Sequence, residues 1–262
     1  SLGFTRIQPS EIMKIAMPLA MAWYFHHFEN RRWFTKYLGA LLILVVPSAL
    51  IAKQPDLGTA ILVFSAGFYV IFLAGLSWWV LGGLIAAAMA VAPFAWHFLH
   101  DYQQKRILTL IDPTTDPLGS GYHIIQSTIA IGSGGIIGKG YMSGTQGQLE
   151  FIPEKHTDFI FAVFAEEWGL VGNIILVVLY GFLIERGLRI SLRASTTFNR
   201  LLAGAITMGF FTYAFVNMGM VSGILPVVGV PLPFISYGGT ALVTLCTGLG
   251  ILMSIETHRT NR

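Results

Sequence analysis

The sequence predicts an all-α polytopic membrane protein with about seven transmembrane helices. Its mean hydropathy is +0.67, and only 11% of its 262 residues are charged. Apolar stretches close to the length that spans a bilayer recur along the chain. Together these features exclude a soluble domain built on a hydrophobic core. The net charge of +3 is too small to suggest nucleic acid as a partner, and the single cysteine, Cys246, excludes a disulfide framework.

Hydropathy indicates seven candidate spans, whose ends it locates only to within several residues. They cover residues 9–26, 37–52, 57–76, 78–98, 159–185, 201–221 and 233–255. Several are short or are interrupted by proline and glycine. Membrane helices tolerate such interruptions where neighbouring groups satisfy the freed backbone.

Three groups of basic residues set the predicted orientation. The groups are Arg31, Arg32 and Lys36; Arg186, Arg189, Arg193 and Arg200; and Arg259 and Arg262. They fall in the first connection, after the fifth span and at the end of the chain. Seven alternating spans put all three groups on one side, which the positive-inside rule identifies as cytoplasmic. Residues 99–158 then form a large extracytoplasmic loop.

The end of that loop carries the residues best suited to chemistry. A charged run through Asp158 turns apolar at Phe159, so it lies at the mouth of a predicted membrane helix. Thr157 is expected to N-cap this helix, with Asp158 in the first turn, where the helix dipole favours a carboxylate. In isolation, capping is the simpler interpretation of Asp158. However, Glu166 and Glu167 follow about 12 Å along the helix, and carboxylates at that depth usually face a polar cavity or a partner charge.

The first span carries an acid and a base in an otherwise apolar helix. Glu11 and Lys14 are three residues apart and therefore share a face. They could simply neutralise each other, or Lys14 could hold an anionic group of a substrate in a polar pocket. Arg6 adds a second cation on the same predicted outer side. Both alternatives remain open from the residues alone.

The outer loop contains two further features. Residues 122–131 are apolar but too short to span, which predicts a surface or re-entrant helix. The glycine-rich run 132–140 contains Lys139 but lacks the spacing of a nucleotide-binding loop. Its backbone N–H groups could cradle a lipid-linked pyrophosphate, or the run could be a flexible hinge; the sequence favours neither. The nearly uncharged loop 221–232 is expected to dip into the membrane, to pack on a partner or to guide a prenyl chain.

These stretches resemble the SEDS family (shape, elongation, division and sporulation). The resemblance lies in residues 8–14, 54–59, 116–127, 132–140, 144–148, 151–172 and 229–239. Residues 116–127 and the run around Lys139 are more similar to the elongation branch than to the division branch. SEDS proteins of this branch have ten spans, so the resemblance implies a single SEDS membrane domain over 1–262 that holds the last seven. The chain begins at Ser1 without an initiator methionine, and we expect the natural protein to start earlier.

The resemblance implies a peptidoglycan glycosyltransferase that polymerises lipid II for cell elongation. It would invert the anomeric carbon without a covalent enzyme intermediate. It would work at the periplasmic side of the bacterial inner membrane. The implied partners are a class B penicillin-binding protein transpeptidase and other elongation-complex proteins. A lipid II flippase is the main alternative, and a scaffold that only recruits the transpeptidase is a third.

The family pattern also assigns residues. The acid of Pro-Glu-Lys-His-Thr-Asp-Phe, here Asp158, corresponds to the family's candidate catalytic residue, and Glu11 and Lys14 correspond to residues of its central cavity. Further candidate substrate-binding residues are Arg6, Lys139, Gln148, Glu154, His156 and Thr157. The undecaprenyl-pyrophosphate leaving group develops charge, so it needs cations or a metal. Lys14, Arg6, Lys139 or a bound Mg²⁺ could supply that charge, and no other cofactor is expected.

Overall fold

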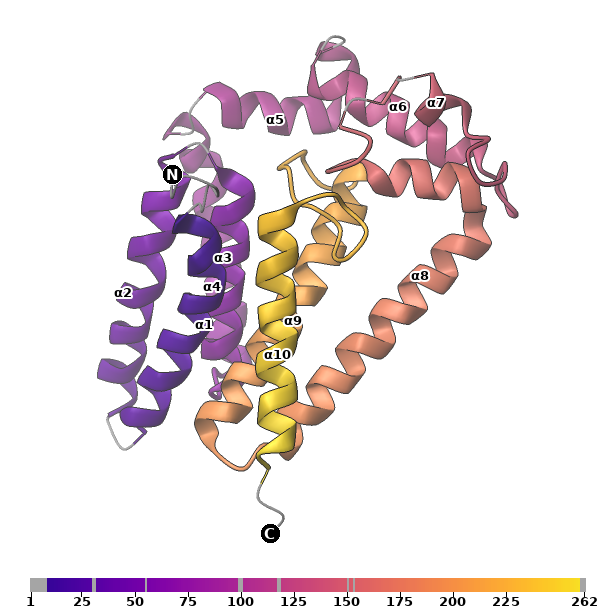
Figure 1. The fold of residues 1–262 in the computed structure, drawn as a ribbon. Helices are drawn as coiled ribbons and strands as arrows, with labels where there is room; N and C mark the ends of the chain where they lie inside the picture. Colours follow the sequence, from indigo (N-terminus) through magenta and orange to yellow (C-terminus); the bar gives the residue numbers. More distant parts are fainter. Residues whose placement is uncertain are drawn as a thin grey trace, which may run out of the picture. The chain divides into compact units, whose positions relative to one another are not determined.

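The structure, a computed structural model, consists of helices and their connections, without a strand in the residues that it describes (Figure 1). These are residues 9–29, 32–54, 56–98, 101–116, 119–149, 151–152 and 154–259. The chain divides into two compact units. The first unit holds Ser1–Gly75, Val178–Phe215 and Pro233–Arg262, and the second holds Leu76–Val177 and Val216–Leu232. Each unit is described by itself.

The first unit packs helices closely around small side chains. Its N-terminal helices are α1 (Pro9–His27), α2 (Trp33–Ala52) and α3 (Leu57–Leu73), and α10 (Gly239–Thr257) packs on α1. Figure 1 shows α1, α2 and α3 side by side. A Cβ on Gly67 of α3 would lie 2.6 Å from Leu44 of α2 and 3.0 Å from Met17 of α1. The bare glycine therefore lets the three backbones approach, as small residues do in membrane bundles.

The second unit is built from shorter helices. They are α4 (Trp78–Ala95), the 3₁₀ turn η1 (Trp96–Phe98), α5 (Asp101–Ile111), the 3₁₀ turn η2 (Pro113–Thr115), α6 (Ser120–Ser133) and α7 (Thr145–Gln148). The Asp116 carboxylate accepts the Ser120 N–H at 3.0 Å and pairs with Lys105 of α5 at 3.1 Å, which joins α5 to the start of α6. The short helix predicted over 122–131 is confirmed as α6.

Two long helices, α8 (Ile160–Arg193) and α9 (Thr197–Val221), run from one unit into the other. Helix α8 breaks at Gly169, whose φ of 63° is accessible mainly to glycine. Four backbone hydrogen bonds from the preceding loop close the break. Lys139 and Gly140 donate to the carbonyls of Glu166 and Glu167 (3.0 Å each), and Leu170 and Val171 donate to those of Gly135 and Ile136 (2.9 and 3.1 Å). The loop thus satisfies backbone groups that the break would leave unpaired.

The predicted spans correspond to α1, α2, α3, α4, α8, α9 and α10, which confirms the all-α polytopic fold class. Among the described helices, α2, α8, α9 and α10 are long and apolar enough to cross a membrane, and α3 and α4 are shorter apolar helices.

Several predicted boundaries differ from the structure. Helices α2 and α9 begin earlier than predicted, at Trp33 and Thr197, so Lys36 and Arg200 lie in helices and not in connections. Helix α8 continues to Arg193, so Arg186, Arg189 and Arg193 lie on its last turns and not in a connection; arginine is a good helix former, and Arg189 pairs with Glu185 one turn away. The last helix begins at Gly239 and not at 233, because Phe234 adopts a left-handed φ of 62° and Gly238 is extended with a φ of −174°, and neither conformation belongs to an α-helix.

Candidate active site

Asp158 lies in a compact turn before α8, in the second unit. Glu154 enters this turn with a left-handed φ of 52°. Its carbonyl accepts the N–H groups of Thr157 (3.0 Å) and Phe159 (3.3 Å), and its carboxylate accepts the Thr157 hydroxyl at 2.8 Å. The expectation that Thr157 caps the helix and that Asp158 occupies the first turn is therefore wrong. Thr157 is engaged by Glu154, and α8 begins only at Ile160.

The pKa of the Asp158 carboxyl group is raised. The group is partly buried, and burial raises its pKa above that of an ordinary aspartate; the nearby negative charge of Glu154 raises it further. A carboxylate with a raised pKa is a stronger proton acceptor. Gly229 lies beside the Asp158 Oδ2 atom: a Cβ there would lie 3.2 Å from that oxygen, and the φ of Gly229 is 73°. Loop 222–232 thus approaches the carboxylate by backbone alone.

The remaining candidates of the second unit differ in their distance from this carboxylate. Glu154 and Thr157 share the turn with Asp158, and His156 of the same turn is exposed. Gln148 is exposed at the end of α7, where its amide faces the Met142 sulfur at 3.5 Å. Lys155 donates to the Gly147 carbonyl at 3.0 Å and so joins the Asp158 turn to α7. The link between Gln148 and the turn in the described residues is therefore through α7.

Lys139 and the glycine-rich run 132–140 make their contacts within the protein. The Lys139 ammonium pairs with the Glu166 carboxylate at 2.7 Å and donates to the Thr145 hydroxyl at 3.0 Å. The N–H groups of Gly138, Lys139 and Gly140 are all bonded to backbone carbonyls. They are not free to cradle a phosphate, so the hydrogen bonds disfavour that alternative. We therefore leave Lys139 out of the proposed substrate contacts.

The loop that contains Lys139 is bound by the Glu166 side chain. This side chain is fully buried. Besides Lys139, it accepts the N–H groups of Thr145 (2.8 Å), Gln146 (3.1 Å) and Gly147 (3.3 Å), together with the Thr145 hydroxyl (3.0 Å). Of the two carboxylates expected to face a polar cavity or a partner charge, Glu166 has a partner charge in Lys139. A buried charge with this many donors fixes the loop and the start of α7 against α8.

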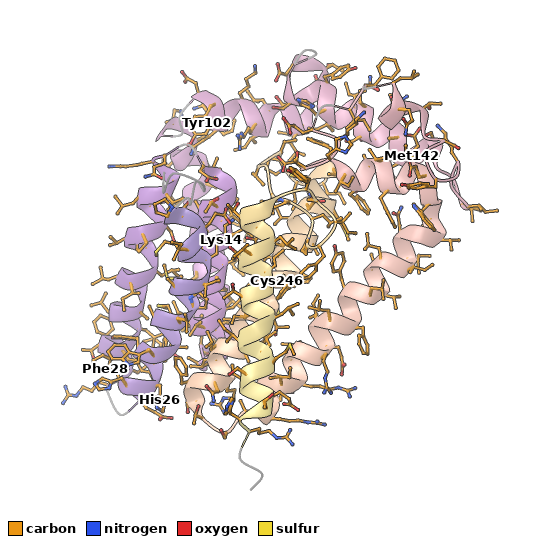
Figure 2. The ribbon with its side chains drawn as sticks, in the orientation of Figure 1. Lys14, His26, Phe28, Tyr102, Met142 and Cys246 are labelled. Carbon is orange, nitrogen blue, oxygen red and sulfur yellow. The ribbon has the colours of Figure 1, made fainter. Side chains whose placement is uncertain are left out.

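The second charged site lies in the first unit. Lys14 and Glu11 share one face of α1, and their side chains pair at 2.5 Å. Lys14 is only 8% exposed, and its ammonium lies 5.4 Å from the centre of the Tyr213 ring. Figure 2 shows Lys14 where α1 adjoins α10. The Glu11–Lys14 pairing, one of the two alternatives that the sequence left open, is present, and Arg6 lies outside the described residues.

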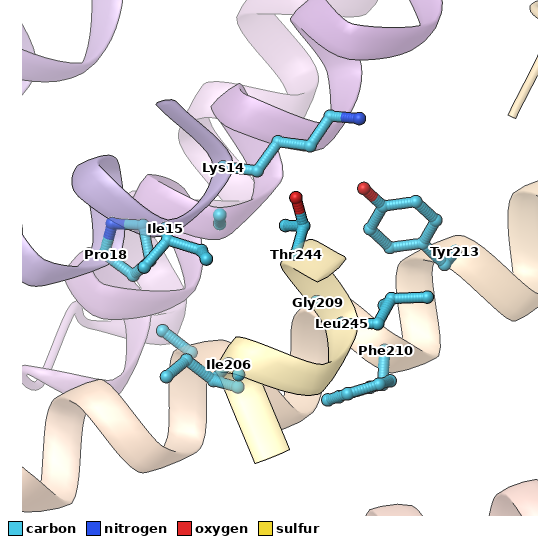
Figure 3. A pocket seen from close by; sticks show the side chains of 12 residues that line it. Lys14, Ile15, Pro18, Ile206, Gly209, Phe210, Tyr213, Thr244 and Leu245 are labelled. Atoms are coloured by element: carbon cyan, nitrogen blue, oxygen red, sulfur yellow. The ribbon is translucent and has the colours of Figure 1, made fainter. Parts of the chain in front are cut away.

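Two hollows border this pair. The smaller, of about 50 Å³, has Lys14, Tyr213 and Thr244 at its polar end (Figure 3). The larger is a groove of about 680 Å³ between α1 and α10. Its lining is apolar apart from Glu11 and three threonines: Glu11, Ile12, Ile15, Ala16, Leu19, Gly239, Thr240, Val243, Thr244 and Thr247. Such a groove suits an apolar chain whose polar end lies near the charged pair.

A protein site for Mg²⁺ is not formed by the residues that the structure describes. Among them, no three histidine, cysteine, aspartate or glutamate side chains gather as ligands for a metal ion. A hard cation such as Mg²⁺ can instead be held largely by substrate phosphates and water. The donor set does not fit a resident metal, and no chemical step is derived through one.

Sequence reasoning did not single out Asn217 or Tyr213. Both lie on α9, within a stretch read as a membrane span. Asn217 is fully buried and bonds to the carbonyls of Asp158 and Val230. A polar side chain inside an apolar span is a signal of function. That signal could have identified Asn217.

Comparison with known proteins identifies the family. The sequence model of the FtsW, RodA and SpoVE family, described as "Cell cycle protein", matches residues 1–261. The chain belongs to the SEDS family. A SEDS relative from Escherichia coli K12, "Peptidoglycan glycosyltransferase MrdB", is 58% identical over an alignment of 263 residues. The alignment covers 98% of this chain and 70% of that relative.

Solved structures agree with this assignment. A chain from "Structural coordination of polymerization and crosslinking by a peptidoglycan synthase complex" matches with a TM-score of 0.81 and 38% identity, over 100% of this chain and 73% of that one. The Thermus thermophilus rod shape determining protein RodA matches with a TM-score of 0.69 and 28% identity, over 100% and 69%. The SEDS family and the polytopic membrane fold expected from the sequence are both confirmed, including the likeness to the elongation branch.

Proposed function

We propose that this protein is a peptidoglycan glycosyltransferase that polymerises lipid II at the periplasmic side of the bacterial inner membrane. The observation that carries the proposal is the partly buried Asp158 carboxylate, outside the membrane helices in a turn that the loop 222–232 approaches without a side chain. The relatives' names support the activity, since MrdB is named a peptidoglycan glycosyltransferase. Elongation of the cell wall is the corresponding biological role.

The chemistry follows from the needs of the reaction. A sugar hydroxyl attacks the anomeric carbon of a lipid-linked sugar, and Asp158 accepts the hydroxyl proton as the new C–O bond forms. The bond to undecaprenyl pyrophosphate breaks, and the leaving group takes the electron pair. An α-linked donor that yields a β-linked polymer is inverted, which requires one base and no covalent enzyme intermediate. Lys14 is the cation proposed to stabilise charge on the pyrophosphate, and the groove between α1 and α10 suits the prenyl chain.

The proposed partners are a class B penicillin-binding protein transpeptidase and other elongation-complex proteins. A glycan strand is useful to the cell wall only when it is crosslinked, so polymerase and transpeptidase must act on the same strand. The similarity to a chain from a complex that coordinates polymerization and crosslinking supports this pairing.

Lipid II flipping is the alternative, because the buried Glu11–Lys14 pair on α1 also suits a transporter. The full-length protein, purified with its transpeptidase and given labelled lipid II, decides between them. We expect glycan polymers in the detergent assay. Absence of polymer together with movement of lipid II across vesicle membranes would reject the polymerase in favour of the flippase.

We expect Lys14→Met to weaken the use of lipid II. A charged hydrogen bond contributes about 1.5–3 kcal/mol, so kcat/KM should fall about tenfold to hundredfold. Methionine keeps much of the side-chain volume, and Lys14→Arg, which keeps the positive charge, should retain more activity. Initial rates over a range of lipid II concentrations measure the effect. An unchanged kcat/KM in Lys14→Met would reject Lys14 as the phosphate partner.

A further inference from the structure

The Asn217 side chain joins two segments that are distant in sequence. Its amide nitrogen donates to the Asp158 carbonyl at 2.8 Å and to the Val230 carbonyl at 2.7 Å. Both partners are backbone oxygens, which only accept, so the nitrogen end of the carboxamide must face them. Both N–H bonds of the amide are used, and the side chain is fully buried. Asn217 therefore ties the Asp158 backbone to loop 222–232.

The second contact between the same segments is made by Gly229. This glycine immediately precedes Val230, so the bond to Asn217 fixes the backbone next to it. A Cβ on Gly229 would lie 3.2 Å from the Asp158 Oδ2 atom, in a backbone conformation with φ of 73° that side chains rarely adopt. Asn217 binds the Asp158 backbone, and Gly229 limits the space beside the Asp158 carboxylate.

We propose that Asn217 and Gly229 are positioning residues that hold Asp158 in the geometry of a general base. The inference rests on the proposed function, because it assigns these residues to the reaction in which Asp158 accepts the proton. A base must lie within hydrogen-bond reach of the proton it takes. A misplacement of about 1 Å can cost about a hundredfold in rate. Asn217 has both amide hydrogens on protein carbonyls and its Oδ1 atom is buried, so it acts on the reaction through Asp158.

The Asn217→Ala variant of the full-length protein tests this assignment. Alanine removes both donors, and we expect kcat to fall about a hundredfold with little change in the KM for lipid II. Asn173→Ala is the matched control. Asn173 lies on α8, and its carboxamide oxygen, like that of Asn217, has no hydrogen-bond partner in the described part of the chain; the kcat of Asn173→Ala should remain near that of the wild type.

The pH profile separates positioning from a loss of folded protein. Partial unfolding lowers the rate equally at every pH, whereas a released carboxyl group gains water and ionises at lower pH. We therefore expect the acidic limb of kcat to move to lower pH in Asn217→Ala. Two neighbouring titratable side chains are Glu154 in the same turn, whose charge acts on Asp158, and His123 of α6, which stacks on Phe159. Residues 216–232 contain no titratable side chain. The Glu154→Gln and His123→Gln backgrounds control for the two neighbours.

Gly229→Ala gives a second, independent result if Asn217→Ala cannot be recovered. Its methyl group crowds Oδ2 while the Asn217 bonds remain possible, and we expect a loss in kcat without a matching change in KM. A wild-type kcat and an unmoved acidic limb in either variant would overturn the inference for that residue. Turnover by Asp158→Asn at the wild-type rate would instead overturn the proposed function itself, so the two failures are distinguishable.

Discussion

We expect Asp158→Asn to lose about 10²–10⁴-fold in the rate of glycan polymerisation, the range that a general base contributes. Asparagine keeps the shape of the side chain but cannot accept the hydroxyl proton. The fold should persist, because Asn217 bonds to the backbone carbonyl of residue 158 at 2.8 Å and not to its carboxylate. Glycan length and initial rate from labelled lipid II, with the full-length chain and its transpeptidase, measure the loss. Partner binding should be unchanged.

Asp112→Asn is the control for this variant. It makes the same chemical change at an exposed turn, where Asp112 accepts the Thr114 N–H at 3.0 Å. It should keep wild-type turnover, since asparagine can accept the same bond. Wild-type turnover in Asp158→Asn would remove Asp158 as the base.

The pH dependence of kcat is an independent test of Asp158 as the base. The base works only when ionised, so kcat should rise with pH through the pKa of Asp158. Burial and the charge of Glu154 raise this pKa, which places the acidic limb above the range of an ordinary aspartate, about 3.9. Glu154→Gln removes one of the two causes, and its acidic limb should lie at lower pH.

The membrane fold could be predicted because its signal is local. Each of the seven spans is a mainly apolar stretch, and hydropathy locates it without reference to the rest of the chain. The predicted boundaries are wrong where hydropathy does not report the backbone conformation: the left-handed φ of Phe234 delays the start of α10, and the arginines up to Arg193 extend α8 beyond its apolar part.

The candidate site was predictable only in part, for the same reason. Glu11, Lys14 and Asp158 stand out as charges beside apolar helices. The bonds of Asn217 to residues 59 and 13 positions away depend on the tertiary fold. Lys139 drew attention as a cation among glycines, yet its partner Glu166 lies 27 residues later. Pattern alone could not tell a phosphate cradle from a loop that closes a break in a helix.

The second large effect is expected when the buried Glu166 carboxylate is replaced. Glu166→Gln should destabilise the protein by about 3–5 kcal/mol, the usual cost of breaking a buried ion pair from one side. Each oxygen of Glu166 faces donors: Oε1 accepts from Lys139 and Thr145, and Oε2 accepts the N–H groups of Gln146 and Gly147. Whichever end of glutamine carries the NH₂ group therefore points a donor at other donors, and the Lys139 charge loses its partner.

The midpoint of thermal unfolding in detergent should fall on the order of 10 °C for this variant. The loop 134–149 should also become more sensitive to proteolysis, since Glu166 is its main attachment to α8. Glu167→Gln is the matched control: it makes the same change on the next residue, which is also buried, and it leaves the donors around Glu166 in place. Equal midpoints for the two variants would show that the Glu166 bonds do not stabilise the fold. A selective loss in Glu166→Gln would show that the broken helix and its loop depend on one buried charge.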